Sequence, residues 1–169
     1  MSIVSRAERS RDLEQHYPIL FKLCVANALP EILTYRMNAD LPFCYGATAE
    51  TTLIPSDWDS EDVRVVPLWE SGSSLTALRR ISGETDFVQI NYEDPNDVEV
   101  LAKSVEGLFT YLFFFLVESV GEGDGEEFSE IEQLASYLGF EKLGMVVDLV
   151  KRVSSESDYE SLFEVTRGI

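Results

Sequence analysis

Carboxylates are by far the most numerous side chains in this chain that could act as acids, bases or metal ligands. The 169 residues include 31 Asp and Glu but a single histidine, His16, and two cysteines, Cys24 and Cys44. The neighbours of His16, in LEQHYPIL, include no activated nucleophile, and such catalysis needs a base within hydrogen-bond reach. We therefore expect no catalytic residues. The two cysteines lie far apart, and we expect them to stay reduced, as in the cytoplasm.

The glycine-rich segment GEGDGEE (121–127) superficially resembles a phosphate-binding loop. Acids between its glycines would repel phosphate, no predicted strand precedes it, and no Lys-Ser/Thr pair follows it. Its carboxylates could hold calcium, but they lack the ordered ligand positions of an EF-hand. A solvated linker explains the segment better, and we expect neither a bound metal nor another cofactor.

A second acidic segment, SDWDSED, places carboxylates around Trp58 on a predicted turn. Aromatic side chains flanked by charges are typical of protein–protein interfaces, and the alternative is a solvated loop with the indole beneath it. Trp69 and Glu70, at the end of a predicted strand, could extend this surface. The candidate partner-binding residues are Asp57, Trp58, Asp59, Glu61, Asp62, Trp69, Glu70, Glu93 and Asp94.

The charge balance narrows the choice of partner. With 31 acidic and 13 basic residues, the formal net charge is -18 at pH 7. Such a surface repels phosphate backbones and anionic lipids, and it attracts basic proteins with fast, salt-sensitive association. We expect a basic protein as partner, and neither nucleic acid nor a membrane.

Four segments in the middle of the chain are rich in β-branched and aromatic residues: 47–54, 63–70, 74–81 and 86–93. The turn sequences PSDWDSED, SGS and SGET separate them, and such short spacers favour antiparallel hairpins. Before them, 10–28 has a helical pattern. We therefore predict an α+β fold: a mainly antiparallel sheet of about four to six strands, N-terminal and central helices packed against it, and a C-terminal helical extension.

The central helix contains the apolar run LFTYLFFFLV (108–117). A bilayer-spanning helix needs about 20 residues, so we expect a core helix. We predict that it begins near Val98, capped by Asn96 or Asp97, with the polar stripe Glu99, Lys103, Glu106 and Thr110. The same stripe continues onto three apolar residues, Phe113, Phe114 and Val117, so the last two turns have no polar face.

The C-terminal part is the natural cover for those two turns. Ser129 and Glu132 form a capping box for a helix that Gly139 ends, 141–153 carries a further apolar face, and Ser157 could begin a last helix. If these helices do not fold back, the apolar end of the central helix is a groove for a partner. We predict a domain over 1–120, an acidic loop over 121–127, and a helical extension over 128–169 packed on the same core.

Three stretches, VVPLWESGSSLTAL, DFVQINYEDP and LAKSVEGLFTYLF, resemble the second half of the SUKH superfamily, which contains yeast cell-wall assembly regulators and many bacterial immunity proteins. In that family a helix begins at an Ala-x-Ser sequence. None of the motifs that this chain shares with the family is catalytic. The corresponding positions are Pro67, Leu68, Gly72, Leu75, Phe87, Ala102, Ser104, Leu108 and Leu112. The Asn-Gly-Gly turn usual in the family's first half is absent.

The resemblance implies a protein that binds a cognate toxin and blocks it, and toxins that cut nucleic acid are commonly basic. We therefore expect a non-enzymatic binding module of the bacterial cytoplasm, an immunity protein that neutralises a basic toxin such as a nuclease. One alternative is an adaptor or regulatory scaffold whose C-terminal helices hold a partner. Another is a hydrolase that uses clustered carboxylates and a metal. The sequence does not indicate an oligomeric state.

Overall fold

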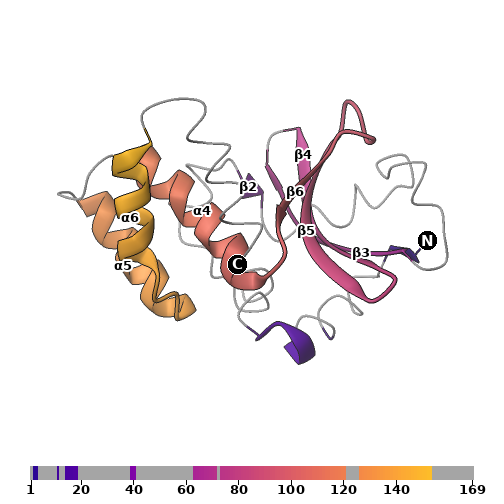
Figure 1. The fold of residues 1–169 in the computed structure, drawn as a ribbon, viewed down its shortest axis with the longest axis horizontal. Helices are drawn as coiled ribbons and strands as arrows, with labels where there is room; N and C mark the ends of the chain where they lie inside the picture. The colour runs from indigo at the N-terminus through magenta and orange to yellow at the C-terminus, as the bar shows by residue number, and fades with distance from the viewer. Residues whose placement is uncertain are drawn as a thin grey trace.

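The computed structural model describes residues 2–3, 11, 14–18, 39–40, 63–71, 73–120 and 126–153, and it has an α+β fold (Figure 1). The predicted fold class is confirmed. The elements in chain order are β1 (Ser2–Ile3), β2 (Ala39–Asp40), β3 (Val63–Ser71), β4 (Ser74–Ile81), β5 (Glu84–Asn91), β6 (Val98–Ala102), α4 (Val105–Val120), α5 (Glu126–Leu138) and α6 (Leu143–Arg152).

The sheet is an antiparallel meander of the four long strands β3, β4, β5 and β6. The two-residue strands β1 and β2 both pair with β3, parallel and antiparallel respectively. Ser82 and Gly83 both have positive φ in the β4–β5 turn, as the tight two-residue hairpin turn requires. The predicted strands 63–70 and 74–81 are confirmed, and β5 lies two residues earlier than predicted. The predicted strand 47–54 lies outside the described residues.

The prediction that the central helix begins near Val98 is wrong, because Val98–Ala102 forms the strand β6, paired with β5. The β-branched Val98 and Val100 pack on one face of the sheet. The helix α4 begins at Val105 instead, where the Gly107 N–H donates to Ser104 Oγ at 3.0 Å. Ser104 is therefore the N-cap residue.

The predicted polar stripe is also only partly correct. Lys103 and Glu106 are exposed, whereas Thr110 is fully buried. The hydroxyl of Thr110 donates to the Glu106 carbonyl oxygen at 2.9 Å, so its burial leaves no unpaired hydroxyl. Glu99 lies in β6 and Lys103 precedes α4, so only Glu106 and Thr110 of the four residues lie in the helix.

The apolar end of α4 is covered as predicted. Phe113, Phe114 and Val117 are at most 1% exposed, and α5 and α6 pack against α4. Figure 1 shows α4 between this helical pair and the sheet. The apolar residues of α4 are therefore core residues on both sides of the helix. No helix in the described ranges is long and apolar enough to cross a bilayer.

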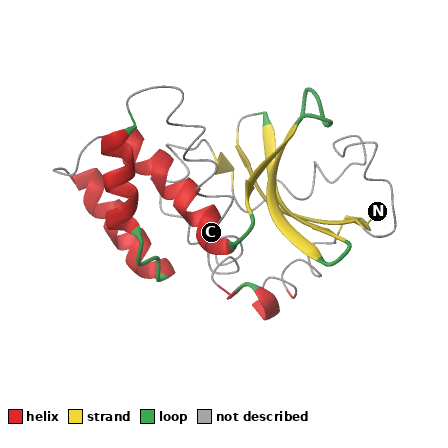
Figure 2. Ribbon diagram, in the orientation of Figure 1, coloured by secondary structure: helices red, strands yellow, loops and turns green. Residues whose placement is uncertain are grey.

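Figure 2 shows the strands of the sheet in yellow, to one side of the red helices α4, α5 and α6. The sheet buries apolar side chains on both faces. On the α4 side, Leu78 and Phe87 join the cluster that continues through α4 to α5 and α6. The opposite face carries a second cluster: Val63, Val65, Leu75, Ala77, Val88 and Ile90. Of the predicted N-terminal helix, only residues 11 and 14–18 are described; there the Tyr17 ring meets Phe87 edge-on, with the ring centroids 6.4 Å apart.

Candidate functional site

A pocket of about 270 Å³ lies where α4 begins and α5 ends. Its described lining combines an apolar floor with two carboxylates. The lining residues are Val105, Glu106, Phe109, Leu138, Gly139, Phe140 and Glu141. It lies in the helical layer, away from the long hairpins of the sheet.

The end of α5 shapes one wall of this pocket. Gly139 has φ +70°, its N–H donates to the Ser136 carbonyl at 3.2 Å, and the Phe140 N–H donates to the Ala135 carbonyl at 2.8 Å. This pair of bonds is the Schellman motif, in which the residue after the glycine makes an apolar contact. The helix stop predicted at Gly139 is confirmed, and this turn directs Phe140 back onto α4. The start predicted at Ser129 is wrong, because α5 begins at Glu126, within the predicted acidic loop, and Ser129 lies inside the helix.

Phe140 is held by two rings of α4. It stacks on Phe113 with centroids 4.7 Å apart and ring planes 3° apart, and it meets Phe109 edge-on with centroids 6.3 Å apart. Both arrangements are favourable for aromatic pairs. Because Phe140 and Phe109 also line the pocket and are both buried, its floor is part of the core.

Charged groups surround the mouth of the pocket. Lys142 Nζ lies 3.0 Å from Glu106 Oε1, and Glu141 is exposed beside them. The Lys142–Glu106 pair is itself largely exposed, so its contribution to folding is small. The two carboxylates outnumber the one ammonium, which leaves the mouth with a net negative charge. The site can therefore accept a side chain that is apolar along its stem and positive at its tip.

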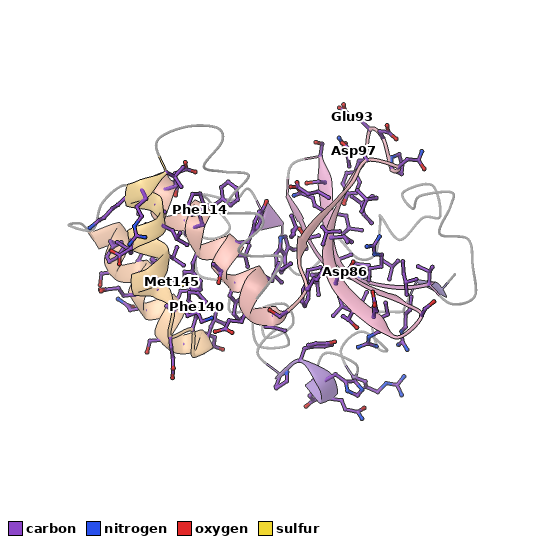
Figure 3. The ribbon with its side chains drawn as sticks, viewed as in Figure 1. Asp86, Glu93, Asp97, Phe114, Phe140 and Met145 are labelled. Atoms are coloured by element: carbon purple, nitrogen blue, oxygen red, sulfur yellow. The ribbon has the colours of Figure 1, made fainter. Side chains whose placement is uncertain are left out.

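The turn between β5 and β6 forms a separate acidic surface. Glu93, Asp94 and Asp97 are exposed there, and the Asp94 carboxylate accepts the Asn96 N–H at 3.1 Å. This bond shapes the turn locally. Figure 3 shows Glu93 and Asp97 together at the turn, well separated from Phe140 and Met145 on the helices. Glu93 and Asp94 were predicted candidates, whereas Asp97 was predicted as a helix cap.

Trp69 is not part of an exposed surface, and that prediction is wrong. The side chain is 3% exposed and belongs to the core cluster shared with α4. The register between β3 and β4 shifts between Pro67 and Trp69, so Trp69 rather than Leu68 lies opposite Thr76. Such a bulge redirects the following side chains, and here it accompanies a Trp69 side chain buried in the helix-side core.

Six of the predicted partner-binding residues have side chains outside the described parts of the structure. Those of the SDWDSED segment lie outside the described residues: Asp57, Trp58, Asp59, Glu61 and Asp62. The backbone of Glu70 is described and pairs with Asp40 of β2 and Leu75 of β4, but its side chain is not among the described parts. Of the nine candidates, the structure therefore brings Glu93 and Asp94 together at the surface.

One buried titratable group was missed by sequence reasoning. Tyr111, in the middle of α4, is 8% exposed, and its burial together with the Glu99 carboxylate raises the pKa of its phenol. The phenol therefore stays protonated at neutral pH. No pattern in the sequence indicated this proximity, because Glu99 was predicted to lie on the polar face of the same helix.

In the parts of the chain that are described, no three His, Cys, Asp or Glu side chains are grouped so that they could hold a metal ion. Comparisons of the chain with protein-family models, with curated proteins and with solved structures gave no match.

Proposed function

We propose that this chain is a non-enzymatic protein-binding module, an immunity protein of the SUKH type that binds and neutralises a basic toxin in the bacterial cytoplasm. The observation that carries the proposal is the net charge of -18, together with exposed carboxylates at the β5–β6 turn and at the pocket mouth. A basic partner is steered toward such a surface and is held by charge pairs.

The resemblance to the SUKH superfamily adds support. Its motifs lie on the elements β3, β4 and β5 and at the start of α4, where Ser104 caps the helix after Ala102. A likeness of fold does not by itself define a function, and the charge supplies the second argument. Nuclease toxins are the favoured partners, because an enzyme that binds nucleic acid commonly has a basic surface.

Co-expression tests this proposal most directly. The open reading frame immediately upstream of the gene should encode a basic toxin, and cells that express it should survive only when this chain is also made. Purified together, the two proteins should separate as the salt concentration rises, because charge pairs at the surface are screened. Failure of the chain to protect the cells would contradict the proposal.

A second candidate function is an adaptor or regulatory scaffold. The observation in its favour is that the two exposed large apolar side chains among the described residues, Tyr137 and Met145, both belong to the α5–α6 layer. Aromatic and methionine side chains are enriched at protein interfaces. A scaffold would bind its partner without neutralising an activity and with little dependence on salt, so the co-expression test separates the two functions.

A further inference from the structure

We infer that the pocket between α4 and the α5–α6 connection receives a lysine or arginine side chain of a basic partner protein. The inference rests on the proposed binding function and names the place where one anchor residue of the partner would lie. The floor is formed by Phe109 and Phe140, and the charges are those of Glu106 and Glu141.

The size of the pocket selects a single side chain. Its volume, about 270 Å³, lies below the range of pockets for drug-sized ligands. Interface anchors are single residues that fill a small pocket at a well-packed site, and arginine is among the most frequent of them. The apolar floor fits the alkyl stem of a long basic side chain, whose charged end stays near the solvent.

The charges at the mouth select a cation. Glu106 and Glu141 both line the pocket, and Lys142 Nζ already lies 3.0 Å from Glu106 Oε1. The mouth therefore holds an ammonium of the chain itself, on a flexible side chain that is 36% exposed. A guanidinium or ammonium from a partner would replace the Lys142 ammonium beside the Glu106 carboxylate. Glu141 would supply the second negative charge.

The pocket floor needs no rearrangement to receive the basic side chain of the partner. The Schellman bonds fix Gly139 and Phe140, and the rings of Phe113 and Phe109 hold Phe140 from two directions. A site that is ordered before binding loses less conformational entropy when a partner arrives. An acidic side chain would meet the two carboxylates, and it would lose affinity through like-charge repulsion.

Nuclear magnetic resonance titration of the full-length chain tests the inference without the toxin. The probe is N-acetyl-arginine amide, and N-acetyl-leucine amide is the neutral comparison. The arginine probe should shift the backbone amide signals of Gly139, Phe140 and Glu141 in a saturable manner, and the leucine probe should shift them much less. Equal shifts from both probes, or none from the arginine probe, would overturn the inference.

Matched variants separate local recognition from the general acidity of the chain. Glu141→Gln should weaken binding of the arginine probe roughly two- to fivefold, whereas Glu130→Gln, on the exposed side of α5, should leave it unchanged. Lys142→Met removes the competing ammonium and should strengthen binding. Equal losses in the two glutamine variants, or weaker binding after Lys142→Met, would show that the pocket does not select the cation.

The outcome of the arginine-probe titration does not depend on the outcome of the co-expression experiment. If the chain fails to protect cells but binds the arginine probe as described, the pocket is a cation site and the immunity function is wrong. If the chain protects cells and the probe does not bind, the toxin is held elsewhere and the assignment of the pocket is wrong.

Discussion

The ring of Phe140, just beyond the end of α5, lies parallel to the ring of Phe113 in α4, with 4.7 Å between their centroids. This contact joins the C-terminal helices to the helix that covers the sheet. Phe140 also lines the candidate pocket, so the stability of the helical layer and the shape of the site depend on the same side chain.

Phe140→Ala should therefore lower the free energy of unfolding by about 3–5 kcal/mol, because it removes a large side chain that is 7% exposed. Tyr137→Ala is the matched control. Its ring is 48% exposed, and its loss should change the free energy of unfolding by less than about 1 kcal/mol. Urea unfolding followed by circular dichroism measures both variants. Similar losses in the two would contradict the assigned role of Phe140.

Two glycines of the same layer should respond to alanine in opposite directions. Gly139 and Gly144 both have space for a methyl group, but only Gly139 has positive φ, at +70°. Gly139→Ala should destabilise the protein by about 1 kcal/mol or more, since the left-handed conformation is costly for alanine. Gly144→Ala, inside α6, should stabilise it by about 0.5–1 kcal/mol. Thermal unfolding of the two variants gives the comparison.

The raised pKa of Tyr111 should make folding stability fall at alkaline pH. The folded state holds the phenol proton more tightly than the unfolded chain, whose pKa is near 10. The contribution of Tyr111 to the free energy of unfolding is fully present below pH 10. Above pH 10 the free energy of unfolding should fall by about 1.4 kcal/mol per pH unit until Tyr111 ionises in the folded state.

Tyr111→Phe cannot ionise and should lose stability less steeply above pH 10, whatever its stability at neutral pH. Urea unfolding at a series of alkaline pH values measures these slopes. Parallel curves for the parent and Tyr111→Phe would show that Tyr111 ionises normally.

Two neighbouring arginines should differ in their importance for stability. Arg79 Nε donates to Asp86 Oδ1 at 2.9 Å on the adjacent strand, and the pair is mostly buried. Arg64 lies opposite Arg80, and its buried Nε has no hydrogen-bond partner among the described residues. Arg79→Met should cost about 1–3 kcal/mol, whereas Arg64→Met should be neutral or stabilising by up to about 1 kcal/mol. Chemical denaturation of both variants is the test.

The acidic β5–β6 turn should contribute to the rate of association with a basic partner. The amide variants Glu93→Gln, Asp94→Asn and Asp97→Asn, combined in one protein, should slow association and reduce its dependence on salt, with a smaller effect on dissociation. Stopped-flow binding to the proposed basic toxin measures these rates. An unchanged association rate would remove the turn from the interface.

Amide substitutions at Asp57, Asp59, Glu61 and Asp62 test the other predicted patch in the same assay.

Patterns that report local chemistry predicted much of this fold. The β-branched and aromatic content of β3 and β4, the turn residues between β4 and β5, and the stop at Gly139 depend on neighbours close in sequence, and the predicted strands, turn and stop are present. The sequence also predicted that helices cover the apolar end of the central helix, because Phe113 and Phe114 leave it no polar face. Both residues are buried. These features are readable because the physical cause and the residues lie within a few positions of one another.

The errors have the opposite origin. Polar residues from Glu99 to Thr110 recur every three or four positions, which mimics one helix, but pairing with β5 makes the first part a strand. A bulge in β3, which leaves no local signal, accompanies the burial of Trp69. The pocket joins Glu106 to Glu141, which are distant in sequence, and so no spacing rule could have found it.

The position of α4 has a consequence for how the chain could be divided. Its two sides belong to a single apolar cluster, one toward the sheet and the other toward α5 and α6. A protein cleaved between Val120 and Glu126 should therefore not release an independent C-terminal domain. The two fragments should stay associated through Phe113, Phe114 and Phe140, and they should restore the fold when mixed as separate chains, as in fragment complementation.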